Sequence, residues 1–401
     1  MVTLHFRGVA MDRAALIDEL KILRDYVGRN HTSLAETEMV LDTTVFTDPE
    51  RHRAETERLY RNYPICVGPS CLLPAPGDYF TFSDTGVPLL LVRGTDGVVR
   101  GFLNMCSHRN APVATGQGRA KLFTCPFHAW TYDLEGKLRG IAYQKDGFPN
   151  CADKSAMGLQ PVQVAEKNGL IFVLPNPVGS FDVNEVEGGI GADLMAFGLK
   201  TNFLYDTARM VVKQNYKSLL EGYHDFYHFA ALHPNTIAKL TYSNIGNYKQ
   251  FGRGHRFSSP SLTIGQLDDM PESEWPLRQN ITVIYYCFPA TVFFVVSNHF
   301  QVWRVYPIDQ QTSVVYQSMY LDQKPRTPEE EAAVRRFFDM INQVVLEEDY
   351  WLGELIQRGL NSGIRRPFIL GRNEIAVQNM HRQIDDVMHR GGQDIGLRAV
   401  G

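Results

Sequence analysis

The chain has 401 residues, of which 44% are hydrophobic and 21% charged, and its formal net charge is −4. This length allows two domains or one large body, each with a proper core. The nearly balanced charge gives no reason to expect nucleic acid or a membrane surface as a partner, and six cysteines are too few for a disulfide scaffold.

Two helices are predicted near the N-terminus. Leucine, isoleucine and valine recur at about helical spacing between Arg13 and Arg29. A second, more charged helix is expected over Asp48–Tyr63, with Asp48 as its N-cap and Pro49 at its first position. Charged residues interrupt the first twenty residues, so no signal peptide is predicted and a cytoplasmic location is expected.

The texture becomes β-rich at Tyr79. The segment "YFTFSDTGVPLLLVRGTDGVVRGFLN" alternates β-forming residues with Asp-Thr-Gly and Thr-Asp-Gly turns, which predicts a meander of short antiparallel strands. The same texture returns in "LQPVQVAEKNGLIFVLPNP", which ends at Pro177. A glycine-rich connecting region is expected from Phe181 to Lys200.

Two Cys-His pairs lie within this region. Cys106-x-His108 and Cys125-x-x-His128 are separated by sixteen residues. Together they could hold one zinc ion, or a [2Fe–2S] cluster with the cysteines on one iron and the histidines on the other. Each predicted hairpin tip offers one residue of each kind, which favours the two-iron cluster. The remaining cysteines show no ligand spacing and are expected to be buried free thiols: Cys66, Cys71, Cys151 and Cys287.

A second group of candidate metal ligands lies in "EGYHDFYHFAALHP", within a helix predicted over Lys213–Leu232. His224 and His228 are four residues apart, share one face of an unbroken helix and would suit zinc. His228 and His233 would not share a face. However, Pro234 disfavours helical backbone at His233, and a helix that ends or loosens there can bring these two histidines together.

The C-terminal half is predicted to contain strands over about residues 280–321, followed by a long helix from Thr327 to about Leu360. The most apolar stretch, "ITVIYYCFPATVFFVVSNHF", is interpreted as two buried strands around a turn at Pro289 and not as a membrane span. The long helix carries three adjacent acidic residues. Glu347 falls on its solvent side, whereas periodicity does not separate Glu348 from Asp349.

The loops "NMCSHRNAPV" and "TCPFHAWTYDLEGKL" resemble those of the Rieske-type non-haem iron oxygenases, in their large (alpha) terminal oxygenase subunit. "EGYHDFYHFAALHP" matches that family's motif E-x-x-x-[DE]-x-x-H-x-x-x-x-H-P. Departures are Phe127, where tyrosine is common, and Asn110 and Ala129, where glycine is frequent. Asparagine tolerates left-handed backbone, so the loop at Asn110 need not change. The presence of alanine at position 129 implies that this position does not require left-handed backbone.

The resemblance implies an α+β fold with an all-β Rieske [2Fe–2S] domain at residues 45–160. The catalytic domain would be a helix-grip fold, an antiparallel sheet around a long helix, formed by residues 161–401 with a helical N-terminal part at 1–44. The cluster would be held by Cys106, His108, Cys125 and His128, and a mononuclear Fe(II) by His228, His233 and Asp349.

The resemblance also implies a role for Asp225, which lies one helical turn before His228. It would bridge, by hydrogen bonds, from an iron-bound histidine to His128 of the neighbouring subunit in a homotrimer. His224 stays outside the motif and is expected to be structural or to support the site. A small beta subunit is compatible with this arrangement.

A terminal oxygenase of this kind uses O2 and two electrons from a separate NAD(P)H-dependent reductase, directly or through a ferredoxin. No G-x-G-x-x-G follows a predicted strand, so the chain itself offers no dinucleotide fingerprint. The expected walls of the substrate pocket are the segments "VIYYCFPATVFFVV" and "HFQVWRVYPI", together with Tyr223, Phe229 and Leu232. Because these walls are apolar and rich in phenylalanine, hydroxylation of an aromatic or alicyclic substrate is the leading expectation. N- or O-demethylation, for example of a quaternary ammonium compound, is the alternative. A Rieske electron-transfer protein and a zinc-stabilised binding protein are alternatives of other classes.

Overall fold

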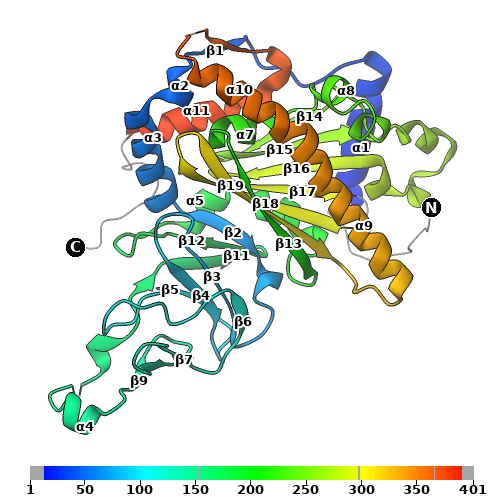
Figure 1. Ribbon diagram of the computed structural model, residues 1–401. Coiled ribbons are helices and arrows are strands. Elements are labelled where there is room, and N and C mark those ends of the chain that lie inside the picture. Colours follow the sequence, from blue (N-terminus) through cyan, green and yellow to red (C-terminus); the bar gives the residue numbers. More distant parts are fainter. Residues whose placement is uncertain (1–12, 152, 297–298, 365, 391–401) are drawn as a thin grey trace.

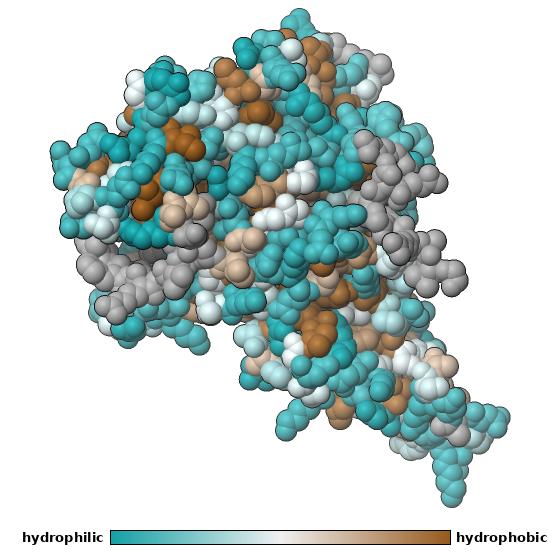
Figure 2. All heavy atoms as spheres, turned by 180° about the vertical axis from the view of Figure 1, so that it is seen from behind, coloured by the Kyte–Doolittle hydropathy of each residue, from teal (hydrophilic) through white to brown (hydrophobic). Residues whose placement is uncertain are grey.

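The computed structural model describes residues 13–151, 153–296, 299–364 and 366–390. Figure 1 shows two parts, a small module of short strands that projects from a larger body of helices around one large sheet. The face shown in Figure 2 is largely hydrophilic, with apolar residues in small separate groups. No helix in the described ranges has the length and hydrophobicity needed to cross a membrane.

The larger body is built on a seven-stranded antiparallel sheet in the order β13-β19-β18-β17-β16-β15-β14. Its strands are β13 (Phe203–Val212), β14 (Asn247–Phe251), β15 (Gly254–Pro260), β16 (Ile281–Cys287), β17 (Thr291–Val296), β18 (His299–Asp309) and β19 (Thr312–Leu321). The two buried strands predicted around Pro289 are β16 and β17. One face of the sheet packs on the buried leucines of α1 (Arg13–Arg29), which forms as predicted.

Helices cover the opposite, concave face of this sheet (Figure 1). They are α7 (Tyr216–Gly222), α8 (Phe229–Leu232), α9 (Pro328–Val344), η9 (Val345–Tyr350), α10 (Trp351–Asn361) and α11 (Ile375–Arg390). The long helix predicted from Thr327 is α9, η9 and α10 in succession, and its middle segment η9 is π-helical. The single helix predicted over Lys213–Leu232 is wrong, because the helix breaks after Gly222 and resumes only at Phe229.

The projecting module consists of three small sheets in the orders β10-β5-β4-β3-β6, β11-β12-β2 and β7-β8-β9. Its strands are β2 (Ile65–Pro69), β3 (Asp78–Phe82), β4 (Leu89–Arg93), β5 (Val99–Leu103), β6 (Gln117–Arg119), β7 (Phe123–Thr124), β8 (Thr131–Tyr132), β9 (Leu138–Gly140), β10 (Pro161–Val162), β11 (Val164–Lys167) and β12 (Leu170–Val173). Because β10 pairs with β5 and β12 with β2, strands on both sides of residue 160 are joined by hydrogen bonds.

Short elements complete the described chain. They are β1 (Met39–Leu41), which pairs with β20 (Phe368–Leu370), and the helices α2 (Thr44–Thr47), α3 (Pro49–Glu55), η1 (Thr56–Arg61), α4 (Gln144–Gly147), α5 (Val183–Glu187) and α6 (Ile190–Leu194). The helix predicted over Asp48–Tyr63 is present as α3 and η1, and the Asp48 carboxylate accepts the Glu50 amide at 2.9 Å as an N-cap. The region predicted as a connection from Phe181 contains α5 and α6.

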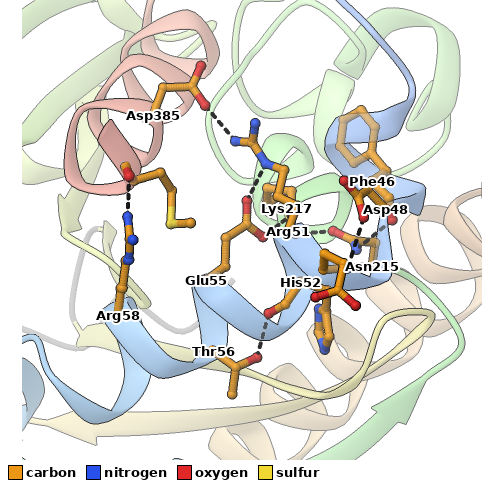
Figure 3. A network of polar contacts seen from close by, with 12 residues as sticks. Phe46, Asp48, Arg51, His52, Glu55, Thr56, Arg58, Asn215, Lys217 and Asp385 are labelled. Atoms are coloured by element: carbon orange, nitrogen blue, oxygen red, sulfur yellow. Dashed lines mark hydrogen bonds and ion pairs between the residues drawn. The ribbon is translucent and has the colours of Figure 1, made fainter. Parts of the chain in front are cut away.

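A buried network of charged side chains anchors α7 to its neighbours (Figure 3). The Glu55 carboxylate on α3 is fully buried and accepts hydrogen bonds from Lys217 Nζ, from the Tyr216 hydroxyl at 2.9 Å and from Arg51 Nε at 2.7 Å. Arg51 also donates to Asp385 on α11.

A second anchor lies at the start of α7, where the side-chain oxygen of Asn215 accepts a hydrogen bond from the backbone amide of Lys217 at 3.0 Å. The backbone amide of Asn215 donates to Gln357 on α10 at 2.8 Å. Helices α3 and α10 therefore hold α7 in place, and α11 in turn holds α3.

Candidate metal centres and active site

The two Cys-His pairs lie at the tips of two loops with the same backbone pattern. Cys106 N donates to Ala111 O and Asn110 N to Cys106 O, both at 2.8 Å. In the second loop, Cys125 N donates to Trp130 O at 2.8 Å and Ala129 N to Cys125 O at 3.0 Å. Each loop thereby wraps its cysteine in one tight turn. The rings of His108 and His128 meet between the loops, with centroids 4.7 Å apart.

The tight turn also corrects one expectation. Asn110 has φ 57°, as asparagine allows, but Ala129 has φ 56°, so its backbone is left-handed as well. The two hydrogen bonds of Cys125 to Trp130 and Ala129 require this conformation, whatever side chain stands there. For an L-residue with a Cβ, left-handed backbone costs about 1–2 kcal/mol, a cost that the loop tolerates.

The side-chain atoms at these tips fit a metal cluster. Cys106 and Cys125 are buried free thiols, and within the described ranges the buried Nδ1 atoms of His108 and His128 have no hydrogen-bond partner. Buried polar atoms are normally paired. Two unpaired imidazole nitrogens beside two thiols therefore fit the Cys₂His₂ donor set of a [2Fe–2S] cluster.

Neighbouring side chains support the first loop. The indole of Trp130 stacks on His108, with centroids 5.0 Å apart and an 8° interplanar angle. The Tyr132 hydroxyl lies 3.1 Å from Cys106 Sγ and accepts the Ser107 amide at 3.0 Å. Burial raises the pKa of Tyr132 to about 12, so its hydroxyl keeps the proton that it can share with the sulfur.

The outer side of His128 faces the surface. Its Nε2 lies 2.8 Å from Arg109 Nη2, and the same guanidinium lies over the Phe127 ring, 4.3 Å from its centroid. A guanidinium has donors only, so this contact needs a lone pair on Nε2, whereas a ring that binds a metal through Nδ1 carries its proton on Nε2; the contact and metal binding exclude each other. Phe127 is 57% exposed. The surface beside the cluster loops thus combines a positive charge with an exposed apolar ring.

A second metal-binding arrangement lies under α8. His228, His233 and Asp349 each offer one ligand atom, and these atoms lie within 4.8 Å of one another. Asp349 Oδ1 is 3.7 Å from His228 Nε2 and 3.2 Å from His233 Nε2. Two imidazoles and one carboxylate on one side of an ion leave its other positions open, which is the donor set of non-haem Fe(II) oxygenases.

Local chain geometry brings the two histidines together. His228 ends the irregular turn after α7, and His233 directly follows α8 with φ −112° and ψ 39°, outside the helical range. The prediction that the helix ends before Pro234 is confirmed. The ring centroids of His228 and His233 are 5.2 Å apart although the residues are five positions apart.

Each of these imidazoles has a carboxylate on its second nitrogen. Asp225 Oδ1 lies 2.9 Å from His228 Nδ1 and also accepts the His228 amide at 3.0 Å. Glu348 Oε2 contacts His233 Nδ1 and accepts the Thr236 hydroxyl at 3.0 Å. Such partners fix the tautomer and the ring orientation, so both Nε2 atoms stay free to bind a metal.

The structure separates the three adjacent acidic residues of η9. Asp349 points into the metal group, Glu348 lies behind His233, and Glu347 is exposed and accepts a hydrogen bond from Gln343 at 3.0 Å, as expected for the solvent side. The contact of Glu348 with His233 was not predicted. Its position next to Asp349 was the one sequence signal that pointed to it.

His224 lies outside both groups. It is fully buried, its Nδ1 contacts Leu220 O, and its ring packs against Tyr286 and His255 with centroids 4.5 and 5.0 Å away. Burial lowers the pKa of His224 to about 4, so the ring is neutral. Its contacts are with Leu220, Tyr286 and His255, whereas His228 lies in the metal group with His233 and Asp349, so the structure gives no support to the zinc interpretation of the His224/His228 pair.

An aromatic wall adjoins the metal group on the concave face of the sheet. The Trp303 ring packs on Tyr223 at 4.8 Å and on Phe294 at 5.2 Å between centroids. The Tyr223 hydroxyl lies 2.5 Å from that of Tyr350, the residue after Asp349. Tyr223 was predicted to line the site, and the strands predicted as walls supply the other two rings.

Two family models match the chain. One, described as the Rieske [2Fe-2S] domain, matches residues 63–159. The other, described as the ring hydroxylating alpha subunit (catalytic domain), matches residues 201–390. The first contains both Cys-His loops, and the second contains His228, His233 and Asp349.

Several characterised proteins are similar in sequence. The carnitine monooxygenase oxygenase subunit of Escherichia coli (strain K12) is 27% identical over 331 residues, which cover 79% of this chain and 83% of that protein. The glycine betaine monooxygenase oxygenase subunit of Chromohalobacter salexigens is 23% identical, covering 80% of this chain and 79% of that protein. The benzene 1,2-dioxygenase subunit alpha of Pseudomonas putida is 34% identical, but over 33% of this chain and 29% of that protein.

Solved structures share the fold. A crystal structure of the quaternary ammonium Rieske monooxygenase CntA in complex with an inhibitor superposes with a TM-score of 0.73, at 22% identity, and covers 89% of this chain and 96% of that one. Naphthalene 1,2-dioxygenase with indole bound in its active site gives a TM-score of 0.69 at 18% identity, over 91% of this chain and 96% of that one.

Proposed function

The chain belongs to the Rieske-type non-haem iron oxygenases, and on that premise we propose that it hydroxylates a small, largely apolar organic molecule. As a terminal oxygenase it carries a [2Fe–2S] cluster and a mononuclear iron, and it depends on a separate electron donor. We assign the cluster to Cys106, His108, Cys125 and His128, and the iron to His228, His233 and Asp349. A reductase that uses NAD(P)H, directly or through a ferredoxin, would supply the electrons.

When bound, the cluster supplies single electrons and the iron activates O2. The chain's own residues position these groups. Asp225 and Glu348 keep the Nε2 lone pairs of His228 and His233 directed at the metal, by binding the Nδ1 side of each ring. The wall of Tyr223, Phe294 and Trp303 gives the substrate an apolar surface beside the metal group and keeps water away from it.

One observation carries the proposed substrate class, which is an uncharged aromatic or alicyclic molecule. Around the aromatic wall, the strands β16 and β17, residues 299–305 of β18 and residues 315–321 of β19 contain a single charged residue, Arg304. Arg304 points to the opposite face of the sheet, where it donates to Val67 O at 3.3 Å. These strands offer a charged substrate no counter-charge.

N-demethylation of a quaternary ammonium compound is the second candidate, favoured by the similarity to the carnitine monooxygenase subunit over 79% of this chain. The test is substrate-dependent oxygen uptake with a surrogate reductase and ferredoxin. We expect hydroxylated product from toluene or cyclohexane and none from carnitine or glycine betaine. The reverse result would assign the chain to the second candidate.

We also propose a head-to-tail homotrimer, with or without a small beta subunit. Figure 1 shows strands β7 and β9 in the lower part of the module, far from α8 at the top of the molecule. A heterologous interface that closes into a ring places one subunit's cluster beside the next subunit's iron. Asp225, bound to His228 on its own chain, would then reach His128 of the next copy.

The substitution Asp225→Asn tests this bridge, because it keeps the shape of the side chain and removes its charge. The variant should keep both metals and the trimer, while its pre-reduced cluster is reoxidised far more slowly on rapid mixing with O2 and substrate. Reoxidation at the wild-type rate would show that Asp225 is not the bridge.

The domain division remains part of the proposal. We divide the chain into a helical part at 1–44, a cluster domain at 45–160 and a catalytic domain at 161–401, with β10–β12 pairing back onto the cluster domain. A cytoplasmic location agrees with the use of a reductase that draws on NAD(P)H.

A further inference from the structure

A buried polar strip interrupts the apolar concave face of the sheet. It consists of His299, Gln301 and Trp303, which alternate along β18, and of Gln317, which lies directly opposite Trp303 on β19. All four side chains are at most 4% exposed. Polar residues in such a position must satisfy each other or a ligand.

Hydrogen bonds within the strip define the role of nearly every polar atom. Gln301 Oε1 accepts from Trp303 Nε1 at 3.0 Å and from Gln317 Nε2 at 2.9 Å. Gln301 Nε2 therefore faces the other way and donates to His299 Nε2 at 3.1 Å. Burial lowers the pKa of His299 to about 3, so the ring is neutral and its Nε2 can accept.

One acceptor of the strip has no donor. Gln317 Oε1 is buried and has no hydrogen-bond partner among the residues that the structure describes. The amide cannot be turned around to relieve this, because its oxygen would then face the oxygen of Gln301, which already receives two donors. Leaving a buried acceptor unpaired costs free energy. A donor from a bound molecule would recover that free energy.

The strip is continuous with the aromatic wall beside the metal group. Trp303 belongs to both, and it packs on Tyr223, which contacts Tyr350 next to Asp349. At the other end of the strip, His299 packs on Phe337 of α9, with centroids 4.9 Å apart. Trp303 therefore joins the polar strip to the aromatic wall beside the metal group.

The wall does not have the form of a cage for a cation. Its three rings are packed on each other, with centroid distances of 4.8, 5.2 and 6.1 Å. A trimethylammonium group held between rings needs those rings spread apart around it. The wall instead consists of packed rings, and Gln301 links its Trp303 to Gln317, which carries the unpaired amide oxygen.

We infer that Gln317 is a specificity-determining residue that selects substrates with a hydrogen-bond donor, a hydroxyl or an amine N–H, on an otherwise apolar body. This inference rests on the proposed function, since it concerns the same site. A substrate that carries an acceptor in place of the donor should bind less tightly, because it would face the acceptor oxygen of Gln317. A quaternary ammonium group has no N–H and gains nothing from Gln317.

The test is calorimetric binding to the metal-loaded protein without O2, so that it does not depend on turnover. The probes are benzyl alcohol, benzyl methyl ether, which can only accept, and benzyltrimethylammonium. We expect benzyl alcohol to bind about tenfold more tightly than the ether in the wild type, the equivalent of about 1.4 kcal/mol. Equal affinities, no binding of the alcohol, or tightest binding of the ammonium probe would each overturn the inference.

Gln317→Leu removes the acceptor and should reduce the alcohol-to-ether ratio to about one. Ser318→Ala is the matched control, since the next side chain of β19 points to the opposite face and contacts Thr207 at 2.9 Å. It should retain the tenfold ratio, and a retained ratio in Gln317→Leu would contradict the inference. Because the probe ratio is measured on the wild type as well, a variant that does not fold leaves the test intact. Binding with the expected ratio but no oxygen uptake would refute the proposed function alone.

Discussion

Removing the carboxylate of Glu55 should destabilise the protein through α7. Glu55→Gln keeps the shape of the side chain but leaves the Lys217 ammonium, 1% exposed, without a negative partner. Burial already lowers the pKa of Lys217, and the charge of Glu55 acts against this shift. Breaking a buried ion pair from one side costs about 3–5 kcal/mol. An unfolding entropy of about 2.1 cal/mol/K per residue gives roughly 0.8 kcal/mol/K for this chain, so the melting temperature should fall by about 4–6 °C.

Scanning calorimetry measures this shift, with metal content determined on the same samples. The double variant Glu55→Gln/Lys217→Met removes the uncompensated charge and should regain most of the lost stability, because the cost arises from the charge that is left behind. Two results would refute the reasoning. One is a fall of less than about 1 °C in the single variant, and the other is a double variant that melts at a lower temperature than the single one.

Three further predictions concern the metal ligands, the second loop and His224. Asp349→Ala should lower the iron content from three to two per chain and leave the visible spectrum of the cluster unchanged; loss of the cluster colour would contradict the assignment. Ala129→Gly should raise the free energy of unfolding by up to about 1 kcal/mol, because glycine adopts φ 56° without strain, and a lower melting temperature would count against it. The pKa of His224 is lowered from 6.5 to about 4 in the folded chain, so between these pH values the unfolded chain alone binds the proton and stability falls as the pH falls. Over this interval His224→Gln should lose about 2–4 kcal/mol less stability than the wild type in denaturant titrations; equal losses would place His224 in a solvated site.

Most of the fold follows from patterns that act over short distances. The buried strands β16 and β17 combine β-branched and aromatic residues around Pro289, and α1 repeats its leucines at helical spacing. The break between α7 and α8 escaped prediction because residues 223–228 contain neither glycine nor proline. The Asp225 carboxylate accepts the His228 amide at 3.0 Å, and this side-chain bond takes the place of a helical one.

The family was recognised from the sequence because the cysteine and histidine candidates for both metal centres lie in short, dense motifs. Helical periodicity could not separate Glu348 from Asp349, and the choice of Asp349 came from the family resemblance. A helical wheel assumes 3.6 residues per turn, but η9 is π-helical, and its wider turn changes the direction of every side chain in that segment. Ala129 was misjudged for a related reason, since its conformation is imposed by the hydrogen bonds of Cys125 and not by its own preference.

The pairing of β10 with β5 and of β12 with β2 limits how the projecting module can be separated or transplanted. A fragment that ends at residue 160 would lack β10 and β12. Their partners β5 and β2 would then each expose a row of free backbone donors and acceptors. Exposed strand edges of this kind pair with other chains and promote aggregation. A fragment that extends to Val173 keeps β10, β11 and β12, and with them the hydrogen bonds that cover both edges. The unit that can be exchanged between proteins is therefore longer than the segment that carries the cluster loops.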